Sequence, residues 1–328
     1  DRLGMFVWQD MPHATYMNAK SNGGETPGRA VYEYALENML NRDYNHPSVI
    51  AVMLFNETWG IDHNGQKASD GMTTNEWIQH LYYKTKEINP HLLVEDMSPC
   101  NNDHIQPTDL NTFHMYPKGY QGSKNTVADR ERNTYPGSAN NFWGGFRQES
   151  EPWLNSEFGG VAAFDGDYDV SWCFKYQTDI QRQYEKLNGY VYTEPYDIEY
   201  ERNGVLTYDR RDKIFGYEDV AYGGDMSIID LNQPNYVGVD IDPALKAAPG
   251  SQYTAPVVAM NWSGETLENP VLKWRFDATD IYGNYITTGK SGEVPMDFAP
   301  YTREQHDISF SPVSYTHLRA HETDQYLV

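Results

Sequence analysis

The sequence predicts an α/β domain built on buried parallel strands, followed by a smaller all-β domain. Over about the first 220 residues, short apolar runs alternate with helical patterns, which is typical of parallel strands with helical crossovers. The next ~90 residues change to alternating Val-, Thr-, Asn- and Gly-rich segments without a helical pattern. Polar residues follow the apolar runs, and both an α/β barrel and a doubly wound sheet place their sites at that carboxyl edge.

Six apolar runs in the first region predict the buried strands. Each is short and ends in polar residues, as expected for strands that are covered on both faces. They are Gly4–Trp8, Ile50–Phe55, Leu92–Glu95, Leu110–Tyr116, Pro152–Glu157 and Gly189–Thr193.

Three segments between these runs predict helices. They are Val31–Arg42, Asn75–Ile88 after Thr74, and Val170–Leu187, for which Asp169 is a suitable N-cap. In the first segment, the residues expected on the apolar face are Tyr32, Tyr34, Ala35 and Met39.

The second region predicts a small β-sandwich. Its strands are expected at Tyr253–Asn261, Val271–Ile281 and Gln305–Ser311, where apolar and polar residues alternate. We place the domain boundary at 222/223, which gives an α/β domain at 1–222 and a sandwich at 223–311. The tail at 312–328 breaks the pattern and resembles translated sequencing-adaptor sequence, so it is expected to lie outside the native fold.

Composition excludes several classes of function. The formal net charge is −22, which repels phosphate backbones and makes nucleic acid an unsuitable partner. No run of about 20 apolar residues predicts a membrane span. Cys100 and Cys173 are the only cysteines and form no CxxC pair, and the sequence lacks HExxH, GxGxxG and Walker motifs. We therefore expect no metal, nucleotide or other cofactor.

Two strand-end carboxylates predict the chemistry. The segment Asn45–Gly60 contains a buried strand that leads to Asn56 and Glu57, and Pro152–Gly160 contains another that leads to Glu157. A lone Glu after a strand is usually a solvated loop residue. A pair at the carboxyl edge of one parallel sheet instead suits the acid/base and nucleophile of a glycosidase.

These segments resemble glycoside hydrolase family 2, which holds β-galactosidases, β-glucuronidases and β-mannosidases. Asn45–Glu57 is similar to the family's acid/base strand, and Asn155–Gly160 to its nucleophile strand. Further blocks agree in order, with Asp1–Asp10 resembling barrel strand 3, Asp109–Pro117 strand 6 and Gly189–Glu194 strand 8. The resemblance implies a (β/α)8 TIM barrel lacking its first two strands, followed by an immunoglobulin-like β-sandwich.

The resemblance also implies a retaining, exo-acting mechanism. Glu157 would attack the anomeric carbon as the nucleophile, while Glu57 would be the acid/base. Asn56 would bind the sugar 2-hydroxyl and Tyr116 would orient the nucleophile.

Other polar or aromatic residues near strand ends are candidates for substrate binding. For each, packing or an ordinary loop role is the alternative. They are His114, Asp10, His13, Trp59, Tyr192, Glu194 and Trp143.

Three alternatives remain at this point. The chain is a catalytically inactive fragment, a non-catalytic carbohydrate-binding protein, or a metal-dependent hydrolase on a similar barrel, although it has few His and Asp clusters. If barrel strands are missing, exposed strand edges predict an insoluble or molten chain. The resemblance allows a homo-oligomer of the complete parent and a cytoplasmic or periplasmic location, and it leaves the sugar open.

Overall fold

The computed structural model describes the chain except for residues 13–26, 58–62, 64, 160–169, 214–228, 243–244, 249, 280–281, 283 and 312–328. The chain divides into two compact units. The first comprises Asp1–Met115, Asp129–Phe158 and Lys186–Tyr192, and the second comprises Tyr116–Ala128, Gly159–Glu185 and Thr193–Val328. The predicted boundary at 222/223 and the tail at 312–328 both lie outside the described residues. Among the helices described, none is long and apolar enough to cross a membrane.

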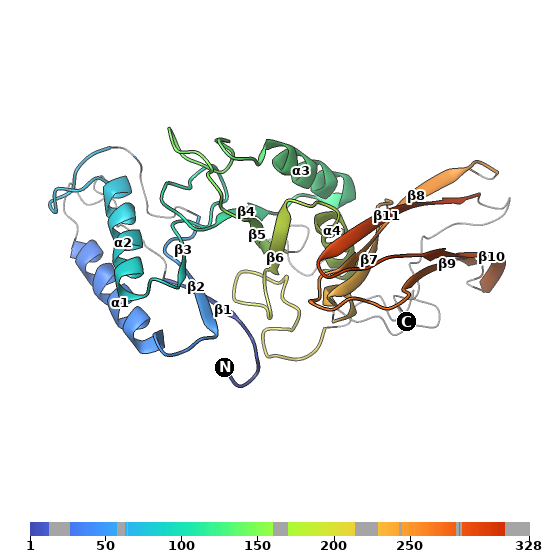
Figure 1. Cartoon of the computed structure of the whole chain (residues 1–328), viewed down its shortest axis with the longest axis horizontal. Coiled ribbons are helices and arrows are strands. Elements are labelled where there is room, and N and C mark those ends of the chain that lie inside the picture. Colours follow the sequence, from blue (N-terminus) through green and yellow to red (C-terminus); the bar gives the residue numbers. More distant parts are fainter. Residues whose placement is uncertain are drawn as a thin grey trace. The chain divides into compact units, whose positions relative to one another are not determined.

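The first sheet contains β1 (Val7–Asp10), β2 (Val49–Met53) and β3 (Leu93–Glu95) in the order β1-β2-β3 (Figure 1). All of its strands are parallel. Asp10 pairs with Met53, and Met53 with Glu95. This register aligns the carboxyl ends of the three strands, so the polar residues that follow them share one edge.

The second sheet contains β4 (Asn111–Met115), β5 (Trp153–Phe158) and β6 (Leu187–Tyr192) in the order β4-β5-β6, again parallel. Its register shifts by one residue near the carboxyl end of β4. Phe113 pairs with Asn155, whereas His114 pairs with Glu157. The irregularity therefore places His114 opposite Glu157 in the ladder.

These six strands confirm the predicted parallel α/β organisation, with ends that differ by a few residues. The described hydrogen bonds form two three-stranded sheets, so a closed barrel is not seen among these residues. The sheets are tied together where β3 leads toward β4. Asp109 donates its backbone N–H to the Val94 carbonyl (2.8 Å), and its Oδ2 accepts from the Val94 N–H (2.7 Å).

Helices α1 (Pro27–Asp43) and α2 (Thr74–Ile88) lie side by side next to the first sheet (Figure 1). The predicted apolar face of α1 is wrong in part, because Tyr34 and Ala35 are exposed. The residues that α1 buries most deeply are Tyr32, Leu36 and Leu40, which are spaced four apart on one face. They share a core with Trp77 of α2 and Leu54 at the end of β2, and this core supports the strand that leads to Glu57.

Helix α2 begins after a capping box. The Thr73 hydroxyl accepts from the Glu76 N–H (3.2 Å), and the Glu76 carboxylate accepts from the Thr73 N–H (2.7 Å). Helix α4 (Val170–Arg182) ends before the predicted Leu187, and Asp169 lies outside the described residues. Helix α3 (Gly119–Asn133) was not predicted. It buries only Ser123 and Val127, so it lacks a recognisable apolar stripe.

The all-β region of the second unit follows the short helix η1 (Asp230–Asn232). Antiparallel strands form one sheet in the order β11-β8-β7 and a second in the order β10-β9. A shared core joins Val257 of β8 to Leu272 of β9, together with Phe298 from the connection between β10 and β11, as a sandwich requires. The strands are β7 (Asn235–Val239), β8 (Tyr253–Asn261), β9 (Val271–Thr279), β10 (Tyr285–Pro295) and β11 (Thr302–Phe310).

Candidate active site

The backbone after β2 turns sharply at Glu57. Glu57 donates its N–H to the Ser98 carbonyl (2.8 Å), and Ser98 donates its N–H to the Phe55 carbonyl (2.8 Å). Glu57 itself has φ +52°, a left-handed conformation that is uncommon for residues other than glycine. Such conformations persist where surrounding contacts over-determine them, and they concentrate at functional sites.

His114 lies between the two predicted catalytic carboxylates. Its Nδ1 is 2.6 Å from Oε1 of Glu57 and 3.3 Å from Oε2 of Glu157. The imidazole side chain is 2% exposed, whereas the Glu57 and Glu157 side chains are 18% and 23% exposed. The two carboxylates therefore remain accessible to a ligand, while the residue that joins them is buried.

One carboxylate oxygen of Glu57, one of Glu157 and a His114 nitrogen all lie within 4.8 Å of one another. The structure thus brings the three residues into one site, although they follow different strands. Two carboxylates this close can act on opposite sides of one reacting bond.

The other nitrogen of His114 contacts the first of two hydroxyl groups that are hydrogen-bonded to one another. Nε2 lies 2.8 Å from Ser98 Oγ, which in turn lies 2.7 Å from Ser156 Oγ. Ser156 immediately precedes Glu157 on β5, and Ser98 is 1% exposed. Neither serine is predicted as a site residue from the sequence. Their only sequence signal is that each lies near the carboxyl end of a predicted strand.

Asp10, at the end of β1, belongs to the same electrostatic environment. Burial, together with repulsion from Glu157, raises the pKa of Asp10 to about 6, while the nearby His114 acts in the opposite direction. A predicted substrate-binding residue is thereby placed near the carboxylate pair.

Glu95, at the end of β3, is a second carboxyl group near the site and is 0% exposed. Burial raises its pKa well above the usual range, against the opposing hydrogen bond that the Thr112 hydroxyl donates. Repulsion from Asp96 and Asp10 adds to the rise. Burial thus favours the neutral form of Glu95.

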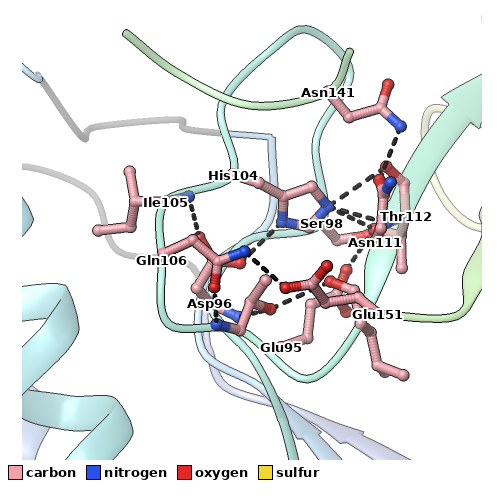
Figure 2. Close-up of polar contacts among 12 residues, drawn as sticks. Glu95, Asp96, Ser98, His104, Ile105, Gln106, Asn111, Thr112, Asn141 and Glu151 are labelled. Carbon is pink, nitrogen blue, oxygen red and sulfur yellow. Dashed lines mark hydrogen bonds and ion pairs between the residues drawn. The ribbon is translucent and has the colours of Figure 1, made fainter. Parts of the chain in front are cut away.

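A buried network surrounds Glu95 (Figure 2). His104 Nδ1 lies 2.7 Å from Asp96 Oδ1, and His104 Nε2 accepts from the Thr112 N–H (2.8 Å). Asp96 Oδ2 also accepts from the Ile105 N–H (2.6 Å). Because the Thr112 N–H can only donate, His104 carries its proton on Nδ1. This network fixes the chain between β3 and β4, and no sequence motif predicts it.

The remaining candidates have separate surroundings. Asn56 is half-buried, and its Oδ1 has no hydrogen-bond partner among the described residues. Trp143 is 42% exposed and stacks on His63, with ring centroids 4.9 Å apart. Tyr192 is half-buried and packs edge-on against Phe158.

Four candidates lie in the second unit or outside the described residues. Tyr116 is half-buried just after β4 and belongs to the second unit. Glu194 also belongs to the second unit, where its carbonyl accepts from the Val205 N–H (3.0 Å). His13 and Trp59 lie outside the described residues.

The same three residues, Glu57, His114 and Glu157, also form a donor set that could hold a metal ion. Two carboxylates and an imidazole suit several divalent metals. The 2.6 Å contact between His114 Nδ1 and Glu57 is a hydrogen bond, however, so a metal would have to displace the proton that lies between the two groups.

No protein-family profile and no curated protein matches this sequence. The structure is similar to those of solved glycoside hydrolases, one of which is described as a GH2 enzyme. A β-glucuronidase 2 from Bacteroides uniformis has a TM-score of 0.49 and 15% identity, with 96% of this chain and 40% of that chain covered. A GH2 β-galacturonidase from Eisenbergiella tayi has a TM-score of 0.49 and 18% identity, with 65% of this chain and 39% of that chain covered.

The chain thus spans about 40% of the length of the solved structures found first. At these identities the likeness concerns the arrangement of the backbone. The chemistry proposed for this chain therefore depends on the side chains of its own site.

Proposed function

We propose that this chain carries the acid/base and nucleophile of a retaining exo-β-glycosidase of the kind found in glycoside hydrolase family 2. The observation that carries the proposal is the close approach of Glu57 and Glu157, whose nearest oxygens lie within 4.8 Å. Retaining glycosidases keep their carboxyl groups ~5–5.5 Å apart, whereas inverting enzymes leave ~6.5–9.5 Å for a water molecule. The short approach favours retention.

The proposed fold follows from the sequence resemblance to glycoside hydrolase family 2. Strands β1 to β6 correspond to strands 3 to 8 of a (β/α)8 barrel, so the strand ends in each sheet face the substrate. Residues 223–311 form an immunoglobulin-like β-sandwich after this catalytic region. Carbohydrate is the proposed partner.

In the first proposed step, Glu157 attacks the anomeric carbon as the glycosidic C–O bond breaks, and Glu57 gives its proton to the leaving oxygen. In the second step, water attacks the same carbon and Glu57 takes its proton, which releases Glu157. Asn56 contributes an amide oxygen that has no hydrogen-bond partner within the described part of the chain, which suits a hydrogen bond from the sugar 2-hydroxyl.

Covalent trapping tests the proposal on the whole chain. We expect 2-deoxy-2-fluoro-β-glycosides of galactose, glucuronic acid, galacturonic acid or mannose to label Glu157, detected by intact mass and peptide mapping. Glu157→Gln should abolish labelling and Glu57→Gln should slow it, while the exposed Glu149→Gln is the matched control.

Labelling at another carboxylate would overturn the assignment of Glu157. Saturable binding of an oligosaccharide without labelling or turnover would instead favour a non-catalytic carbohydrate-binding protein.

A further inference from the structure

We propose that His114 supplies one N–H that Glu57 and Glu157 share, and that Ser98 and Ser156 are positioning residues that keep this proton on Nδ1. The inference rests on the proposed function for its catalytic meaning. Its structural part, the tautomer of His114, can be tested independently of activity.

The first step concerns the nitrogen that faces the carboxylates. A charged carboxylate oxygen can only accept hydrogen bonds, and the carbonyl oxygen of a protonated carboxyl group accepts as well. Nδ1 of His114 lies 2.6 Å from Glu57 Oε1 and 3.3 Å from Glu157 Oε2. A proton on this nitrogen can therefore form hydrogen bonds with both carboxyl groups. Nε2 then has a lone pair and needs a donor.

Ser98 supplies that donor. Its hydroxyl carries a single proton and lies 2.8 Å from Nε2, and the Glu95 carboxyl group is a second hydrogen-bond partner of Ser98. In this inference Ser98 gives its proton to the imidazole and accepts from Glu95, whose raised pKa favours the protonated form. In the 2.7 Å contact between the two serines, Ser156 then donates to Ser98 in preference to the Phe113 carbonyl, which lies 3.4 Å from Ser156 Oγ. The chain of donors leads from Ser156 through Ser98 and His114 to the carboxylates.

Both ends of this hydrogen-bond chain, Ser156 and His114, adjoin Glu157. Ser156 is bonded directly to Glu157 along β5, and the register shift in β4 places His114 opposite Glu157. Ser98 also holds the Glu57 backbone, because its carbonyl accepts from the Glu57 N–H. One buried serine therefore positions both the acid/base backbone and the imidazole between the two carboxylates.

A shared donor suits the proposed double displacement. Negative charge resides on Glu157 before the first step and on Glu57 in the glycosyl-enzyme, since Glu157 becomes an ester as Glu57 loses its proton. An N–H that faces both carboxylates stabilises whichever one is charged, with little movement of the ring. Fixing the tautomer in advance avoids reorganisation during the reaction.

His104 provides an internal reference. Asp96 accepts from its Nδ1 and the Thr112 N–H donates to its Nε2, so its proton is also on Nδ1. Its donor is a backbone group, whereas the donor to His114 is a side chain. A change at Ser98 should therefore affect His114 and leave His104 unchanged.

The experiment is 15N NMR of the full chain with labelled histidine, at neutral pH. The His114→Gln and His104→Gln variants assign the two rings. We expect the wild-type His114 to show a protonated Nδ1 and an unprotonated Nε2. Ser98→Ala should shift population to the Nε2–H tautomer, Ser98→Thr should retain the wild-type pattern, and Ser156→Ala should produce a smaller shift.

A wild-type His114 protonated on Nε2, or on both nitrogens, would overturn the inference. An unchanged His114 spectrum in both Ser98→Ala and Ser156→Ala would also overturn it. If the chain turns over an aryl glycoside, Ser98→Ala should lower kcat by roughly 10- to 100-fold, with KM nearly unchanged. The reason is that the change of tautomer removes the hydrogen bond from Nδ1–H of His114 to a charged carboxylate. Absence of turnover would count against the proposed function and would leave the tautomer result standing.

Discussion

The carboxyl group of Asp10 lies within electrostatic reach of Glu157, although the two residues end strands of different sheets. Burial and this repulsion together raise the pKa of Asp10 to about 6, from an ordinary value of 3.8. The folded chain therefore binds a proton at Asp10 more tightly than the unfolded chain does. The difference makes the stability of the fold depend on pH.

Asp10→Asn is expected to remove this dependence. In the wild type, the stability that protonated Asp10 contributes is fully present below pH ~4 and is lost as the pH rises through about 6. The variant cannot ionise, so its melting temperature should match the wild type near pH 4 and exceed it at pH 7. Calorimetry at the two pH values measures the difference.

Asp43→Asn is the matched control for Asp10. The hydrogen bond from Arg42 lowers the pKa of Asp43, so the pH dependence of stability due to Asp43 is opposite in sign to that due to Asp10. Its variant should lose stability relative to the wild type as the pH rises. A gain at pH 7 in both variants would refute the assignment to Asp10.

Glu95→Gln is expected to be tolerated near neutral pH. Glu95 is completely buried and burial raises its pKa, which favours the neutral form, so an amide of the same shape preserves the acceptor for the Thr112 hydroxyl. Urea unfolding should show a change in the free energy of unfolding below about 1 kcal/mol.

Glu95→Ala is the contrasting variant. It removes the acceptor of Thr112 and opens a cavity, and it should cost about 2–4 kcal/mol. Equal losses for Glu95→Gln and Glu95→Ala would mean that the carboxyl group is ionised in the fold. The contribution of Glu95 to stability depends on pH in the same direction as that of Asp10, and it is lost as the pH rises through the pKa of Glu95.

Lys175 and Asp179 form a buried ion pair within the second unit. Lys175 Nζ lies 2.7 Å from Asp179 Oδ2, the side chains are 4% and 3% exposed, and Asp179 also accepts from the Tyr236 hydroxyl. Lys175→Met should cost about 3–5 kcal/mol, because Asp179 would remain buried without its countercharge.

A double-mutant cycle separates the pair from the packing around it. Lys175→Met with Asp179→Leu should recover much of the loss, since neither charge then remains buried. The exposed pair Lys273–Glu293 is the control, and breaking it should cost less than about 1 kcal/mol. A double variant as unstable as Lys175→Met would argue against an electrostatic origin.

Thr73→Ala is expected to destabilise the start of α2. The variant removes the acceptor for the Glu76 N–H, which should cost about 1 kcal/mol in urea unfolding. Thr73→Ser keeps the hydroxyl and should remain within a few tenths of a kcal/mol. A comparable loss in Thr73→Ser would show that the threonine methyl group contributes rather than the cap.

Elements with strong local patterns were predictable from the sequence, and elements supported mainly by distant partners were not. The six parallel strands are apolar runs, so their burial can be recognised from neighbouring residues alone. Strand β10 was missed because Tyr285–Pro295 contains two glycines and many polar residues, and its pairing with β9 is interrupted by a register shift at Thr287/Lys290. Helix α3 was missed for a related reason, since its helical residues are mostly polar.

By itself, the sequence determined that Glu57 and Glu157 end buried strands and that Asp10 and His114 accompany other strands of the same kind. Only the tertiary structure decided that His114 joins the two carboxylates and that Ser98 and Ser156 contact one another behind it. The strand-end positions follow from local periodicity, which repeats every two residues along a strand. The hydrogen-bond partners depend on the one-residue register shift between β4 and β5, and on the return of the chain after β3, which are set by contacts far apart in sequence.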